Sequence, residues 1–91
     1  MKYTYILLCQ DGTYYTGWTK DLTNRLETHN EGKGAKYTRG RLPVSLVYWE
    51  GHKSRSEAQK REYFIRKLSR QKKEALIKKF AVEKDDSCGG G

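Results

Sequence analysis

The stretch YTYILLCQDGTYYTGWTKDLTNRLETHN, residues 3–30, decides the fold of this chain. β-Branched, aromatic and aliphatic side chains dominate residues 2–9 and 13–19, so each segment is predicted to form a strand. Gly12 lies between the two segments and predicts a hairpin turn. The tyrosines of this stretch either fill the core of a small sheet or take part in chemistry.

The hairpin turn has two possible lengths. A two-residue turn at Asp11-Gly12 would place Tyr5 and Tyr15 on opposite faces of the sheet. A three-residue loop over 10–12, with Gly12 in the left-handed conformation, would place both tyrosines on one face. The turn residues alone do not decide between these loops.

A helix is predicted directly after the hairpin. Asp21 is a good N-cap, and two glycines end the helix shortly after Asn30. One stripe along this helix has the spacing of a core-facing side: Leu22, Arg25, Leu26 and His29. The arginine and the histidine either flank the core and extend to solvent or point into a polar cleft beside the sheet. Because they lie one turn apart, we favour the cleft.

The rest of the chain completes an α+β domain. The further predicted elements are a basic loop over 33–43, a strand over 44–50, a helix from Ser54 or Ser56 to about Leu68, and a helix over about 70–80. The order β-β-α-β-α-α implies a small three-stranded antiparallel sheet flanked by helices. Residues 81–91 lose periodicity and end in glycines, so we expect a disordered tail after a domain over 1–80.

Composition favours a polyanionic partner. The net charge is +8 for the whole chain and +10 over residues 1–80. Such a field attracts nucleic acid first, although a charged surface also keeps a small protein in solution. There is no signal peptide, no long apolar run and no zinc-like cysteine spacing, so we expect a cytoplasmic protein that does not enter a membrane.

Several motifs in this order resemble the GIY-YIG endonuclease family. They are Tyr3-Thr4-Tyr5, Tyr15-Thr16-Gly17, Arg25 and a glutamate, Glu62, in the helix segment KREYFIRKL. The resemblance covers residues 2 to about 80. The run HNEGKGAKYTRGRLPVSLVY is similar to that of small, stand-alone bacterial members.

The resemblance implies a nuclease that hydrolyses phosphodiester bonds with Mg²⁺ or Mn²⁺. Glu62 matches the metal-binding glutamate and Arg25 the phosphate-binding arginine. Tyr15 matches the tyrosine that activates water, and Tyr5 the tyrosine that supports it. His29 matches a polar helix position. Joint use of the two tyrosines requires the three-residue hairpin loop.

The chemistry of these residue types agrees with such a reaction. Phosphodiester hydrolysis develops negative charge on oxygen, so cations directed at that charge lower the barrier. Mg²⁺ keeps several waters and therefore needs few protein ligands. A guanidinium can fork onto two phosphate oxygens, a geometry that lysine lacks. A phenolate near an arginine and a metal can accept a proton from water.

Further residues are expected to contact nucleic acid. Gly17 leaves room for a phosphate or a backbone to approach. Lys36, Arg39 and Arg41 are expected to contact backbone phosphates, and Tyr37 to stack on a base, although the same loop could simply be solvated. The other aromatic side chains are expected to pack in the core or the sheet: Tyr3, Tyr14, Trp18, Tyr48, Trp49 and Tyr63.

The resemblance thus implies a metal-dependent endonuclease, with DNA favoured over RNA as the substrate. A structure- or end-directed activity in DNA repair or recombination follows from the resemblance, with a protein partner for substrate targeting. Many family members have an asparagine late in the chain, and none follows Glu62 here. The alternative is therefore a nucleic-acid-binding module with the nuclease fold and little or no activity.

Overall fold

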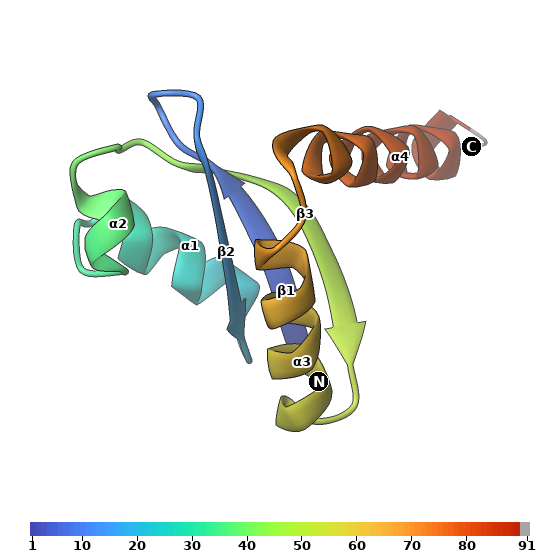
Figure 1. The fold of residues 1–91 in the computed structure, drawn as a ribbon, viewed down its shortest axis with the longest axis horizontal. Helices are drawn as coiled ribbons and strands as arrows, with labels where there is room; N and C mark the ends of the chain where they lie inside the picture. Colours follow the sequence, from blue (N-terminus) through green and yellow to red (C-terminus); the bar gives the residue numbers. More distant parts are fainter. Residues whose placement is uncertain (90–91) are drawn as a thin grey trace.

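A three-stranded antiparallel sheet with helices around it forms the molecule (Figure 1). The computed structural model describes residues 1–89, with side chains described through Val82. The elements in chain order are β1 (Lys2–Leu8), β2 (Tyr14–Thr19), α1 (Leu22–Asn30), α2 (Lys36–Arg39), β3 (Ser45–His52), α3 (Arg55–Arg66) and α4 (Arg70–Gly89). β1 lies between β2 and β3. The predicted α+β class and element order are confirmed, with α2 as an addition.

The hairpin between β1 and β2 has the three-residue loop. The Cys9 amide donates to the Thr13 carbonyl at 2.8 Å, and Gly12 has a φ of +86°. Only glycine adopts this left-handed conformation without a steric penalty. The resulting register places Tyr5 and Tyr15 on the same face of the sheet.

Each face of the sheet carries its own core. On one face the buried residues are Tyr5, Leu7, Cys9 and Val44, with Leu22 and Leu26 of α1 packed against them. On the other face they are Ile6, Tyr48 and Ile65, covered by α3 and by apolar residues of α4. The alternation of β1 supplies both cores, because successive side chains of a strand point to opposite faces.

Side-chain caps fix where two helices begin. The Asp21 carboxylate accepts from the Asn24 amide at 3.0 Å, as its predicted N-cap role requires. Ser54, rather than Ser56, caps α3 and accepts from the Glu57 amide at 3.2 Å.

Two segments differ from their predicted structure. The basic loop over 33–43 contains one helical turn, α2, and α4 continues to Gly89 instead of ending near residue 80. The irregular tail predicted from Ala81 is therefore helical as far as Gly89, because no glycine or proline interrupts the sequence before that point. Residues 90–91 lie outside the described residues, and a domain boundary at 80 stays a prediction. No helix of the described residues is both long and apolar enough to cross a membrane.

The segment between α1 and β3 is attached at both ends. The Asn30 amide group donates to the Val44 carbonyl at 3.1 Å and accepts from the Val44 amide at 2.8 Å. Within the segment, the Arg41 guanidinium donates to the Asp11 carboxylate at 2.9 Å. The backbone carbonyl of Arg41 accepts from the Gln10 amide. This segment therefore has a defined position beside the hairpin.

Replacement of Asn30 by alanine should test this attachment. Asn30→Ala removes the two hydrogen bonds to the backbone amide and carbonyl of Val44, so we expect the free energy of unfolding to fall by about 1–2 kcal/mol. Asn24→Ala on the same helix removes a side chain with no such bonds and should cost less than about 0.5 kcal/mol. Urea denaturation followed by circular dichroism measures both. Equal losses in the two variants would contradict the assigned role of Asn30.

Candidate active site

Three of the predicted site residues meet between β1 and α1. Tyr5 and His29 are buried, and the Tyr5 hydroxyl lies 3.1 Å from His29 Nε2. Arg25 Nε donates to the same hydroxyl at 3.3 Å. The helix stripe therefore directs Arg25 and His29 toward the sheet rather than past the core into solvent.

The hydrogen bonds through His29 have one direction. The Thr38 hydroxyl donates to the Ala35 carbonyl at 2.9 Å, and it lies 2.8 Å from His29 Nδ1. Since that hydroxyl has only one hydrogen, it must accept from Nδ1–H of His29. Nε2 is then the acceptor and takes the Tyr5 hydroxyl hydrogen. The Tyr5 oxygen is left to accept from Arg25.

Burial sets the charges of this group. Burial, and secondarily the charge of Arg25, lowers the pKa of His29 to about 4. Burial also raises the pKa of Tyr5 above its usual value, against the opposing hydrogen bond from Arg25. The hydrogen bond to Tyr5 raises the pKa of Arg25. At neutral pH the histidine and Tyr5 are neutral, and Arg25 carries the positive charge.

Two glycines provide space for these rings. A Cβ atom at Gly17 would lie 2.6 Å from the Tyr5 hydroxyl oxygen, and one at Gly34 would collide with the ring of His29. At Gly17, where we expected a phosphate or a backbone to approach, the position that a Cβ would occupy is taken by the Tyr5 side chain. Both glycines are thus required by the packing of the buried rings.

Tyr15 lies at the open side of this group. Its ring centroid is 6.4 Å from that of Tyr5, 5.3 Å from that of His29 and 6.0 Å from that of Tyr37, on which it stacks. Tyr15 lines a hollow of about 270 Å³ together with Tyr14, Thr16, Tyr37, Arg66 and Lys73. Tyr15 can therefore reach solvent, whereas Tyr5 cannot.

Glu62 lies in α3 and is connected to the hollow of Tyr15 through Arg66, which pairs with Glu62 and lines that hollow. After burial, the charges of Tyr15 and Glu62 also contribute to the raised pKa of Tyr5. The Glu62 side chain is 19% exposed and pairs with Arg66 at 3.3 Å. Arg66 also reaches the Thr16 carbonyl of β2 at 3.4 Å. Arg66 was not among the predicted site residues, although its i,i+4 spacing from Glu62 is a usable signal.

The donor set suits a hydrated cation. Among the described residues, no group of three or more His, Cys, Asp and Glu side chains lies close enough together to hold a metal. Glu62 is the carboxylate that could bind one here. Mg²⁺ commonly binds through one or two carboxylates and keeps several waters, so this donor set fits Mg²⁺.

The predicted nucleic-acid contacts of the 33–43 segment divide into two kinds. Lys36 and Arg39 are exposed, and Tyr37 is 41% exposed. Arg41 instead pairs with Asp11, and its guanidinium lies 4.1 Å from the ring centroid of Tyr37. Arg41 therefore holds the segment in place, while Lys36 and Arg39 remain accessible. Tyr37 is only partly accessible, because its ring stacks on Tyr15 and contacts the Arg41 guanidinium.

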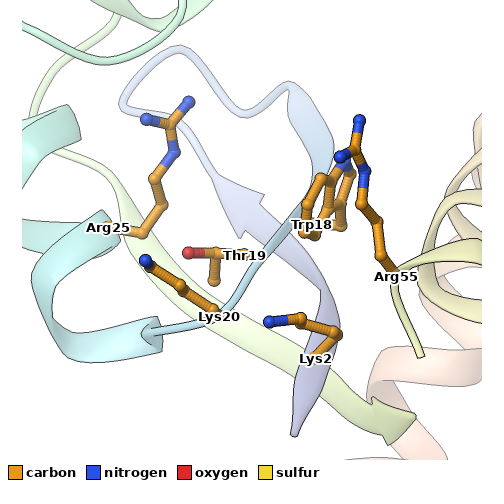
Figure 2. A pocket seen from close by; sticks show the side chains of 6 residues that line it. All are labelled: Lys2, Trp18, Thr19, Lys20, Arg25 and Arg55. Carbon is orange, nitrogen blue, oxygen red and sulfur yellow. The ribbon is translucent and has the colours of Figure 1, made fainter. Parts of the chain in front are cut away.

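A second basic hollow adjoins Arg25 (Figure 2). It has a volume of about 400 Å³ and includes Trp18, which we expected to be packed in the core or sheet. The side chain is half-buried and borders the hollow instead. The sequence carried no signal for this, because burial of an edge-strand residue depends on what packs beside the sheet.

The pH dependence of stability should report on His29. The unfolded chain protonates this side chain below about pH 6.5, whereas the folded protein keeps it neutral down to about pH 4. The unfolded state thus binds more protons in this window, and the free energy of unfolding should fall by about 2 kcal/mol as the pH drops from about 6.5 to about 5. Urea titrations of the wild type and His29→Gln between pH 7 and 5 measure the slope. The variant should lose most of the slope, and an unchanged slope would contradict the assignment.

Comparisons with known proteins agree with the fold and identify the family. The model of the GIY-YIG catalytic domain matches residues 1–75. A UPF0213 protein of Clostridium perfringens is 51% identical over 94% of this chain and 92% of its own length. A UPF0213 protein of Halobacterium salinarum is 57% identical over 85% of this chain and its full length.

Two solution NMR structures share the fold. The UPF0213 protein of Bacillus halodurans is 51% identical and superposes with a TM-score of 0.55, covering 86% of this chain and 84% of that chain. A protein from E. faecalis is 46% identical with a TM-score of 0.58, covering 88% and 85% respectively. With the matched domain spanning most of the sequence, the chain belongs to the GIY-YIG family.

Proposed function

We propose that this protein hydrolyses phosphodiester bonds in nucleic acid with the help of Mg²⁺ or Mn²⁺. The observation that carries the proposal is the fixed group of Arg25, Tyr5 and His29, with Tyr15 beside it. Glu62 of α3 is connected to this group through Arg66, which lines the hollow that Tyr15 borders. Membership in a nuclease family supports the same reaction class.

Arg25 is suited to hold the scissile phosphate. Its Nε is bonded to the Tyr5 hydroxyl, which leaves the terminal nitrogens available and restricts the direction of the guanidinium. A preoriented, permanently charged fork stabilises charge that develops on phosphate oxygens. Tyr5, His29 and Thr38 serve as positioning residues behind it.

Tyr15 is the better of the two tyrosines for activating water. The Tyr5 hydroxyl is buried, and its hydrogen is engaged with His29. Tyr15 borders an open hollow, and it lies close enough to Arg25 to contribute, after Tyr5, to the raised pKa of that arginine. A group that removes a proton from water must meet that water, and Tyr15 satisfies this requirement.

Glu62 is the residue that would bind the divalent cation. The ion, when bound, would stabilise negative charge on the phosphate and on the leaving oxygen. Arg66 now pairs with this carboxylate, so metal binding and the Glu62–Arg66 ion pair compete.

The finer points of the proposal come from the family resemblance. They are endonucleolytic cleavage of DNA rather than RNA, a structure- or end-directed substrate, a role in repair or recombination, a protein partner for targeting and a cytoplasmic location. The alternative, a binding module with little activity, is favoured by one observation. Glu62 is already partly neutralised by Arg66.

Cleavage assays with matched variants should separate the two functions. Labelled branched, single-stranded and duplex DNA are incubated with Mg²⁺, Mn²⁺ or EDTA. Arg25→Ala should lower the rate by about 10²–10³, because it removes a cation directed at the developing charge. Arg25→Lys should recover little, since lysine lacks the fork.

The metal role of Glu62 needs its own control. Glu62→Gln should abolish metal-dependent cleavage, whereas Glu27→Gln, the same change at an exposed position of α1, should not. Absence of cleavage by the wild type on every substrate with both metals would favour the binding module.

Thr38 offers a test of the positioning chain. Thr38→Val keeps the shape but removes the acceptor for Nδ1–H of His29, so we expect a change in the ring ¹⁵N shifts of His29 and about a tenfold lower kcat. Thr38→Ser should restore both, because serine keeps the hydroxyl. NMR of the histidine ring and steady-state kinetics measure the two effects. If valine and serine behave alike, Thr38 has only a packing role.

A further inference from the structure

The basic hollow beside Arg25 has the features of a binding site. It is lined by Lys2, Trp18, Thr19, Lys20, Arg25 and Arg55. Its volume of about 400 Å³ lies in the range of about 300–1,000 Å³ that is typical of ligand pockets. Figure 2 shows positively charged groups around the end of β2, with Trp18 and Arg55 close together on one side.

The charges of this hollow are not neutralised. Among residues whose side chains are described, no carboxylate pairs with any of its four cations. Other arginines of the protein do have such partners: Arg41, Arg61, Arg66 and Arg70. Four unpaired positive charges around one concavity favour a ligand with several negative charges.

An aromatic ring lies among these cations. The guanidinium of Arg55 is 5.6 Å from the ring centroid of Trp18. Arg55 is exposed and has no carboxylate partner in the described part of the chain, so it can move onto a phosphate while the indole accepts a base. Aromatic rings next to cations are how proteins bind single-stranded nucleic acid without reading its sequence.

The hollow connects the two faces of the sheet. Trp18 and Thr19 are consecutive in β2, so their side chains point to opposite faces. Thr19 shares the face of Tyr5 and Tyr15, whereas Trp18 lies on the face covered by α3. Because β2 is an edge strand, a ligand can pass from Arg25 around this edge to the indole.

We propose that this hollow binds an unpaired strand of nucleic acid next to the bond that Arg25 positions. One base stacks on Trp18, and adjacent phosphates contact Lys2, Lys20 and Arg55. This inference rests on the proposed function and narrows its substrate to nucleic acid with a single-stranded segment beside the cleaved bond. A fully paired duplex offers no free base to the indole.

Binding without metal tests the charge contribution. A labelled oligothymidylate is titrated in EDTA at several salt concentrations, with fluorescence anisotropy as the measurement. The double variant Lys2→Gln and Lys20→Gln should reduce the slope of log K against log salt by about 1.4, since each phosphate on a single strand contributes about 0.7. Its control, Lys78→Gln with Lys79→Gln, removes the same charge from exposed positions of α4, which packs near β3 at the other edge. Equal effects of the two pairs would overturn the proposal.

Substitution of Trp18 tests the stacking. Trp18→Ala should weaken binding of the oligothymidylate about 5- to 100-fold, with a much smaller effect on a blunt duplex or an abasic oligomer. Trp18→Phe should retain most of the affinity, and it carries the test if the alanine variant does not fold. Equal losses on all three ligands, or none on the oligothymidylate, would overturn the proposal.

The same assay distinguishes failure of the pocket from failure of the proposed function. Wild-type protein that binds the oligomer through Trp18 in EDTA but cleaves nothing with Mg²⁺ or Mn²⁺ supports the pocket and contradicts the nuclease. If the wild type cleaves nucleic acid but the Trp18 and lysine variants bind the oligomer as well as their controls do, the result supports the nuclease and contradicts the pocket. Parallel titrations with oligouridylate assign the strand as DNA or RNA.

Discussion

The hydroxyl group of Tyr5 is the atom on which the site depends. It is buried at the centre of the sheet face, accepts from Arg25 and donates to His29. A buried hydroxyl without partners would cost free energy, so the fold must supply both bonds. The arrangement needs the glycine opposite Tyr5 in β2, because any side chain at Gly17 would occupy the position of the phenol. The central strand, the edge strand and α1 are thereby linked through one oxygen.

The Tyr5 hydroxyl is also connected, through hydrogen bonds, to the segment between α1 and β3. Its partner His29 depends on Thr38, which follows the loop after α1, and Thr38 in turn depends on the Ala35 carbonyl. Asn30 and Arg41 hold that segment against β3 and the hairpin. The direction of the Arg25 guanidinium is consequently determined by residues that never contact it.

Much of the fold could be predicted from periodicity and capping. β-Branched, aromatic and aliphatic composition identified the strands, Asp21 marked the start of α1, and the i, i+3, i+4, i+7 stripe predicted that Arg25 and His29 face the sheet. The turn residues left two hairpins open, and the register that decided between them depends on packing across both faces. The short helix α2 and the continuation of α4 were not predicted. The absence of glycine and proline between residues 70 and 88 was a usable signal for the longer α4, whereas the single turn of α2 carries no strong local signal.

For the candidate site, the sequence identified residues but not their surroundings. The family resemblance identified Tyr5, Tyr15, Arg25 and Glu62. Their unequal exposure to solvent depends on the tertiary structure and could not be predicted from the sequence. Gly17 was expected to admit a ligand and instead admits a neighbouring ring. Arg41 and Arg66 illustrate why charge alone says little about function, because each of these side chains is already paired with a carboxylate.

The position of β2 at the margin of the sheet has a further consequence for self-association. An outer strand exposes backbone donors and acceptors that a second molecule could extend into a longer sheet. Here the approach is flanked by Lys20, Arg25 and Arg55, and a second copy would bring the same charges against them. Like charges resist that contact, so these cations also disfavour edge-to-edge aggregation of the protein.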